Sequence, residues 1–170
     1  ENQIRQNMLI FKRKITDQIQ KTIGSGKILL IFGPRQAGKT TLAKSLLAEH
    51  GNPDAYFNCE EVAVREHFSV GEPDMLKELV GSHKLVVFDE AQTVENIGAI
   101  LKVFVDKYTD VQIIATGSSS FDLANKINEP LTGRAFSFTL YPLSLAEISS
   151  AKEVNDGELH NLMRFGSYPA

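Results

Sequence analysis

The chain contains no tryptophan and only one cysteine, Cys59, among its 170 residues. A single cysteine cannot form an internal disulfide, and sparse cysteine is typical of proteins from a reducing compartment. No apolar run approaches the roughly 20 residues that span a bilayer. The N-terminus also lacks the pattern of a signal peptide. These absences favour a cytoplasmic protein with no membrane segment.

Two kinds of catalytic or structural site are also disfavoured. The four histidines, at positions 50, 67, 83 and 160, have no ligand-like spacing to one another or to Cys59. This argues against a zinc site, which needs such ligands at regular short intervals. No Ser-His-Asp arrangement can be argued from the sequence either.

The net charge of −3 is unevenly distributed. Residues 1–50 carry nine Lys and Arg against three Asp and Glu, whereas the remaining residues carry nine against eighteen. A basic N-terminal third permits contact with nucleic acid. The simpler interpretation is that Arg35, Lys39 and Lys44 surround the loop described next, while the other basic residues are spaced along a helix.

Residues 30–47, LIFGPRQAGKTTLAKSLL, contain the pattern G-x-x-x-x-G-K-[ST] between an apolar stretch and a helical one. In such a Walker A motif, or P-loop, backbone N–H groups close around phosphate oxygens and the helix N-terminus adds its positive dipole end. Lys39 is expected to reach the β- and γ-phosphates, and Thr40 to ligate Mg²⁺. The motif predicts a nucleotide site formed by Gly33, Pro34, Arg35, Gln36, Ala37, Gly38, Lys39, Thr40 and Thr41.

A second apolar stretch, KLVVFDE (84–90), ends on two acids, as a Walker B motif does. Asp89 is expected to hold Mg²⁺ directly or through water, since this cation takes few carboxylates and keeps several waters. Glu90 is expected to polarise the water that attacks the γ-phosphate. The stretch AYFNC (55–59) intervenes between the two motifs, as in the P-loop division that carries a catalytic glutamate.

Apolar stretches alternate with amphipathic ones along a chain long enough for one domain with a sizeable core. This alternation predicts an α/β, three-layer P-loop NTPase fold, with a mainly parallel five-stranded sheet and helices on both faces. The expected strands are 27–33, 55–59, 84–90, 111–120 and 135–143. The expected helices are 4–23, 39–50, 60–69, 73–81, 94–108, 121–128, 144–150 and 156–165.

Five segments, in this order, resemble a family of prokaryotic AAA+-type ATPases: GPRQAGKTTL, VVFDEAQ, IIATGSSSFDL, LTGRAFSFTLYPLSLAEI and FGSYP. The resemblance covers about residues 25–169, and GRAFSFTLYPLS is its most specific part. It implies an ATP-binding, Mg-dependent ATPase core that acts as a switch or motor on an unknown macromolecular client. In this family the core precedes a C-terminal domain of unknown function with winged-helix character.

The resemblance implies two catalytic residues besides Glu90 and Lys39. Ser118, at the end of the fourth expected strand, should sense the γ-phosphate, with Thr116 and Ser119 as alternatives. Arg134, just before the fifth strand, should stabilise charge on the transferred phosphoryl group, in its own chain or on a neighbouring subunit. The alternative for Arg134 is a surface arginine that pairs with a carboxylate.

The expected organisation is an N-terminal helix (1–24) packed on the core, the AAA+-type core (25–150), and the start of a truncated C-terminal region (151–170). The separate lid domain of most AAA+ motors has no clear counterpart, which argues against strong motor activity driven by oligomerisation. Because these residues also lack the second domain, we expect a monomer with slow hydrolysis. The guanine-selecting N-K-x-D motif is missing, which favours ATP and ADP as ligands. A slow ATP-binding signalling module is the alternative, and a P-loop kinase is less favoured because the arginines are scattered.

Overall fold

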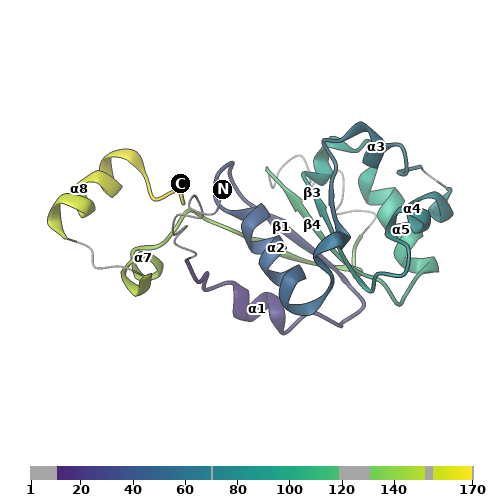
Figure 1. Cartoon of the computed structure of the whole chain (residues 1–170), viewed down its shortest axis with the longest axis horizontal. Coiled ribbons are helices and arrows are strands. Elements are labelled where there is room, and N and C mark those ends of the chain that lie inside the picture. Colours follow the sequence, from purple (N-terminus) through teal and green to yellow (C-terminus); the bar gives the residue numbers. More distant parts are fainter. Residues whose placement is uncertain (1–10, 70, 119–130, 152–154, 170) are drawn as a thin grey trace, which may run out of the picture.

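The structure of the protein, a computed structural model, describes residues 11–69, 71–118, 131–151 and 155–169. Its centre is a five-stranded sheet of order β2-β3-β4-β1-β5, in which every neighbouring pair is parallel (Figure 1). The sheet expected from the sequence is therefore confirmed. The strands are β1 (Ile28–Phe32), β2 (Tyr56–Asn58), β3 (Leu85–Asp89), β4 (Gln112–Gly117) and β5 (Ala135–Thr139).

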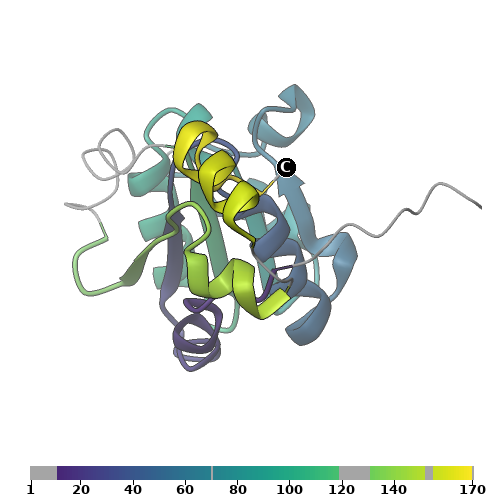
Figure 2. The same cartoon turned by 90° about the vertical axis from the view of Figure 1, so that its left-hand side faces the viewer.

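Helices cover both faces of the sheet, which confirms the three-layer arrangement. Figure 2 shows α2 and α5 on opposite sides of the strands. The α-helices are α1 (Thr16–Gln20), α2 (Lys39–His50), α3 (Val62–Arg65), α4 (Pro73–Val80), α5 (Ile97–Lys107), α7 (Leu145–Ala151) and α8 (Asp156–Phe165), and the 3-10 helices are η1 (Pro53–Ala55) and η2 (Ala91–Thr93). Within the described ranges, no helix combines the length and apolar character needed to cross a membrane.

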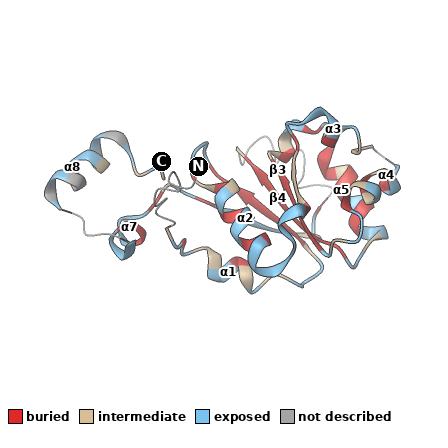
Figure 3. Cartoon of the chain, viewed as in Figure 1, coloured by how far each residue is buried: buried red, intermediate tan, exposed pale blue. Residues whose placement is uncertain are grey.

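The central strands form the core of the molecule. Every residue of β1, β3 and β4 is buried, and Figure 3 shows buried residues concentrated in these strands and in the helix surfaces beside them. Because helices cover both faces of the sheet, neither face of these strands contacts solvent. This explains the uninterrupted apolar runs in the sequence. β5, at the edge of the sheet, is only half-buried or exposed.

The N-terminal helix is shorter than the sequence periodicity predicts. Within the described part of the predicted helix 4–23, the α-helix covers only Thr16–Gln20. The Lys14 amide donates to the Glu147 carboxylate at 2.8 Å, so a long-range contact takes a backbone group that a helix would have used. The prediction was wrong here because amphipathic spacing carries no information about such a distant competitor.

Other expectations also differ from the structure in extent, and the predicted helix 60–69 contains only the short helix α3, Val62–Arg65. The fifth strand ends at Thr139 instead of residue 143, because its partner β1 ends at Phe32, where the loop of residues 33–38 begins. The predicted helix 121–128 lies outside the described residues. The predicted helices 144–150 and 156–165 correspond closely to α7 and α8.

Helices α7 and α8 lie at one end of the molecule, away from α3, α4 and α5 (Figure 1). After α8 the chain returns toward the core, where the Leu143 amide donates to the Ser167 carbonyl at 2.8 Å. Pro169 Cγ then lies 3.4 Å from the position that a Cβ on Gly38 would take. The segment FGSYP therefore lies against the phosphate loop, although it follows it by more than a hundred residues in sequence.

Candidate functional site

The loop of residues 33–40 joins β1 to α2, and its two glycines are needed for different reasons. Gly38 adopts a φ of 91° at the N-cap of α2, a left-handed conformation that favours glycine. Gly33 instead permits a close approach, because a Cβ there would lie 2.1 Å from the Leu140 carbonyl oxygen. Gly33 therefore lets the loop pack against the residue that follows β5, and Gly38 lets the loop turn into α2.

Lys39 lies over this loop and is only 4% exposed. Its Nζ donates to the carbonyls of Gly33 and Pro34, each at 3.0 Å. Burial lowers the pKa of the Lys39 ammonium, an effect opposed by the negative charges of Glu90 and Asp89. The ammonium is thus held within the loop and faces the two acids at the end of β3.

The Asp89 carboxylate accepts hydrogen bonds from three hydroxyl groups. Thr40 Oγ1 donates to Asp89 Oδ2 at 2.7 Å, the Tyr56 hydroxyl donates to the same oxygen at 2.6 Å, and Thr116 Oγ1 donates to Oδ1. Burial is the main cause that raises the pKa of the Tyr56 hydroxyl, and the hydrogen bond to Asp89 raises it further. The hydroxyl therefore stays protonated and donates to Asp89. The two residues expected to ligate a metal, Thr40 and Asp89, are in direct contact.

This donor set fits Mg²⁺ bound together with a phosphate ligand. A hydroxyl and a carboxylate are the hard oxygen ligands that Mg²⁺ prefers, and the ion is usually held by one or two carboxylates plus substrate phosphates. Among the described residues, no three His, Cys, Asp or Glu side chains gather as a metal site. The arrangement suits an ion that arrives with its nucleotide better than one caged by the protein alone.

Glu90 follows directly in the chain and has an unusual backbone. Its φ of 52° lies in the left-handed region, which few non-glycine residues adopt and which occurs often at functional sites. The Glu90 amide donates to Thr116 Oγ1 at 3.1 Å, and its Oε2 accepts from Gln92 Nε2 at 2.5 Å. The same nitrogen lies 3.3 Å from Ser118 Oγ, so Gln92 links the expected base to the expected sensor.

Two cavities meet at the loop. One, of about 430 Å³, is lined by Glu90 and by residues of the loop and the first turn of α2. The other, of about 560 Å³, lies between α2, the segment around α1 and Leu143. Gly38, Thr41 and Pro169 line both cavities. The two cavities therefore adjoin at the loop, and Phe11 lines the second of them.

The structure brings most of the expected site residues together at the carboxyl ends of β1, β3 and β4. These are the loop residues, Asp89, Glu90 and, through Gln92, Ser118. Thr116 contacts Asp89, and Ser119 lies outside the described residues. The residues that the sequence interpretation missed are Tyr56 and Gln92; Gln92 sits within the motif VVFDEAQ, two positions after the predicted base.

Arg134 is not brought to this site. Its carbonyl accepts from the Ile28 amide at the first residue of β1, whereas the loop follows the last residue, Phe32. Its guanidinium donates to both carboxylate oxygens of Asp106, at 2.7 and 3.1 Å. In this structure Arg134 pairs with a carboxylate at the amino ends of the strands, which does not fit a role within its own chain's site.

A model of the AAA domain matches residues 25–149. The chain belongs to this AAA family. Uncharacterized proteins of Mycobacterium tuberculosis and Mycobacterium bovis are each 30% identical to it over 145 residues, which is 85% of this chain. The chain spans only 32% of the length of these relatives.

Solved structures share the fold at low identity. The Walker-type ATPase PABY2304 of Pyrococcus abyssi superposes with a TM-score of 0.67 over 94% of this AAA chain and 65% of that chain, at 17% identity. The ORC2 protein of Aeropyrum pernix, solved as ADPNP-ADP complexes, gives a TM-score of 0.54 over 80% and 48%, also at 17% identity. The resemblance to AAA-type P-loop ATPases and the three-layer fold are both confirmed.

Proposed function

We propose that this AAA core binds ATP with Mg²⁺ and hydrolyses the bond between the β- and γ-phosphates, as a switch or motor that acts on a macromolecular client. The observation that carries the proposal is the 2.7 Å hydrogen bond between Thr40 and Asp89, which joins the phosphate loop to the acid pair. Membership of the AAA family and the P-loop ATPase neighbours support a nucleotide as the ligand.

The chain's own groups have distinct tasks in binding. Loop N–H groups and the Lys39 ammonium hold the phosphates, and Lys39 exchanges the carbonyls of Gly33 and Pro34 for phosphate oxygens. Thr40 and Asp89 would hold Mg²⁺, which would supply positive charge against the charge that develops on the phosphate oxygens. The 560 Å³ cavity receives the nucleoside, because it adjoins the phosphate cavity and presents the apolar surface of Phe11.

Glu90 acts as the base in hydrolysis. The oxygen of a water molecule bonds to the γ-phosphorus, its proton passes to the Glu90 carboxylate, and the bond from the γ-phosphorus to the bridging oxygen breaks. ADP leaves with the bridging oxygen, and the second product is inorganic phosphate. Gln92 orients the base through its 2.5 Å contact, and Ser118 lies beside it to meet the γ-phosphate.

Binding of Mg-ATP and phosphate release, measured on the chain and on Lys39→Ala, test the proposal. Lys39→Ala removes the buried ammonium, so we expect Mg-ATP affinity and turnover to fall below detection while circular dichroism stays unchanged. A variant that binds Mg-ATP as tightly as the parent contradicts the phosphate-loop assignment. Tight binding by the parent without phosphate release favours the alternative, a slow ATP-binding module.

A further inference from the structure

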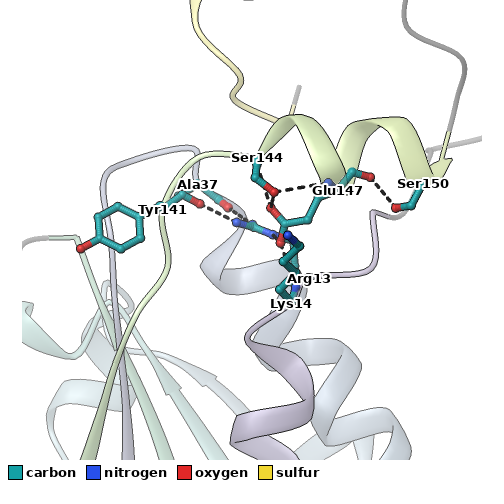
Figure 4. Close-up of polar contacts among 7 residues, drawn as sticks. All are labelled: Arg13, Lys14, Ala37, Tyr141, Ser144, Glu147 and Ser150. Carbon is teal, nitrogen blue, oxygen red and sulfur yellow. Dashed lines mark hydrogen bonds and ion pairs between the residues drawn. The ribbon is translucent and has the colours of Figure 1, made fainter.

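Arg13 is a buried arginine outside the motifs that define the site. It lies in the segment before α1, is 8% exposed, and uses all three guanidinium nitrogens (Figure 4). Nη1 donates to the Ala37 carbonyl at 2.7 Å, Nη2 to the Tyr141 carbonyl at 2.5 Å, and Nε to Glu147 Oε1 at 3.2 Å. One side chain therefore joins the phosphate loop, the segment after β5, and helix α7.

The contact with Ala37 determines how the loop presents its next amide. The described residues have no cis peptide bonds, so the Ala37 carbonyl and the Gly38 N–H lie in one planar unit and point in opposite directions. When Arg13 holds the carbonyl on its own side, the Gly38 N–H is turned to the other side. Gly38 lines the phosphate cavity, so the hydrogen bond from Arg13 orients a donor of the loop.

At the other end of the link, Glu147 is held by more than Arg13. Its Oε1 also accepts from the Lys14 amide at 2.8 Å, while its Oε2 accepts from the Ser144 amide at 2.8 Å and hydroxyl at 2.9 Å. Ser144 and Glu147 form a capping box, in which the glutamate at the third helical position bonds back to the cap residue. The Glu147 carboxylate that caps the N-terminus of α7 is thus the same one that accepts from Arg13 (Figure 4).

We propose that Arg13 is a positioning residue for phosphate binding, and that its bond to Glu147 couples nucleotide binding in the loop to the docking of α7 on the core. The inference rests on the proposed function, because the coupled ligand is the nucleotide. Coupling is reciprocal: a nucleotide that stabilises this loop conformation stabilises the position of α7 by the same free energy. The segment that returns to the loop after α8 should be coupled in the same way. Its Ser167 carbonyl accepts from the Leu143 amide, and Leu143 directly precedes the capping residue Ser144.

Arg13→Lys and Glu147→Gln separate this role from a purely structural one. Lysine keeps the charge but has one nitrogen in place of the planar fork, so it cannot reach three segments at once. We measure the Kd of Mg-ADP by calorimetry and hydrogen exchange in residues 144–151 with and without Mg-ADP. In the parent, Mg-ADP should slow exchange in α7. In both variants the Kd should rise about tenfold, as for the loss of a charge-assisted hydrogen bond, and the slowing should vanish.

Arg65→Lys is the matched control. Arg65 also donates to two main-chain carbonyls, those of Cys59 and Glu60, but it lies on α3, away from the phosphate loop. Its substitution should leave both readouts at parent values. If Glu147→Gln does not fold, Arg13→Lys alone decides, with circular dichroism as the check on its fold.

The outcomes distinguish this inference from the proposed function. A parent that binds no Mg-ADP refutes the nucleotide site and the coupling together. A parent that binds Mg-ADP, with Arg13→Lys binding equally well and α7 still responding to the ligand, refutes the coupling and leaves the nucleotide site intact.

Discussion

Thr40 donates a hydrogen bond to Asp89 at 2.7 Å, although 49 positions separate them in the sequence. Thr40 lies on α2, which follows β1, whereas Asp89 ends β3, and β4 lies between β1 and β3 in the sheet. The contact arises because α2, which begins at Lys39, crosses the face of the sheet and packs against β3 and β4. The first turn of this helix therefore carries the Thr40 hydroxyl to the end of β3, where both oxygens of the carboxylate are already oriented by hydroxyl donors.

The two acids should respond differently to loss of charge. Glu90→Gln keeps the Thr40–Asp89 pair, so we expect unchanged Mg-ATP affinity and hydrolysis slowed by roughly 10²–10⁴, the usual worth of a positioned base. Asp89→Asn removes a metal-holding charge, so we expect weaker dependence of binding on Mg²⁺. Nucleotide titrations at several Mg²⁺ concentrations, together with phosphate release, separate the two effects. Identical losses from both substitutions contradict this division of roles.

Gln92 should affect turnover through Glu90. Gln92→Ala removes the 2.5 Å donor, and we expect the rate of phosphate release at saturating Mg-ATP to fall about ten- to a hundredfold, the range for a hydrogen bond to a charged group. Gln92 does not line the phosphate cavity, so the Kd of Mg-ATP should stay within about twofold. Gln18→Ala, at an exposed position of α1, is the control. A parallel loss of affinity and turnover means that Gln92 acts on binding instead.

The sequence predicts the loop, the acid pair and the α/β alternation because each depends on local spacing. It does not predict that Tyr56 and Gln92 hold the two acids, since these contacts depend on how strands and turns meet in space. The helix predicted over 4–23 is too long for the same reason. Its Lys14 amide bonds to Glu147, a contact that depends on the tertiary fold. Arg134 is different: a residue that precedes a strand of a parallel sheet lies at its amino end, so topology itself argues against a role at the carboxyl ends.

Glu147 should make the stability of the chain sensitive to acid. Burial alone raises the pKa of its carboxyl, but hydrogen bonds from Ser144, Lys14 and Arg13 outweigh burial and lower the pKa from 4.5 to about 2. A depressed pKa stabilises the folded chain fully above the unfolded value, and the stabilisation is lost as the pH falls from about 4.5 through about 2. The shift corresponds to about 3 kcal/mol in the free energy of unfolding.

Denaturant unfolding of the parent and of Glu147→Gln across this pH range measures the effect. The difference in the free energy of unfolding between the two should be largest near neutral pH and should shrink as the pH falls below about 4.5. Glu78→Gln, which changes an exposed carboxyl on α4, should keep a constant difference from the parent. A constant difference for Glu147→Gln as well contradicts the assignment of a strongly lowered pKa.

Arg134 should have no effect on hydrolysis within a single chain. Its guanidinium pairs with Asp106 at the amino ends of the strands, opposite the phosphate loop, so Arg134→Ala should leave the turnover of a monomer within about twofold of the parent. A role across subunits predicts a different result where chains associate. There Arg134→Ala should cut turnover by roughly 10²–10³ with ATP affinity unchanged, because an arginine finger meets charge that develops only in the transition state.

Mixing variants decides between these cases. Arg134→Ala and Lys39→Ala chains, each inactive alone in an assembly, should restore activity together only if one subunit donates its arginine to the nucleotide of the next. A fall in the turnover of the monomer contradicts the placement of Arg134 seen here. Unchanged turnover at every protein concentration, with association verified by light scattering, means that Arg134 is a surface arginine whose partner is Asp106, and the role implied by the family resemblance is then wrong.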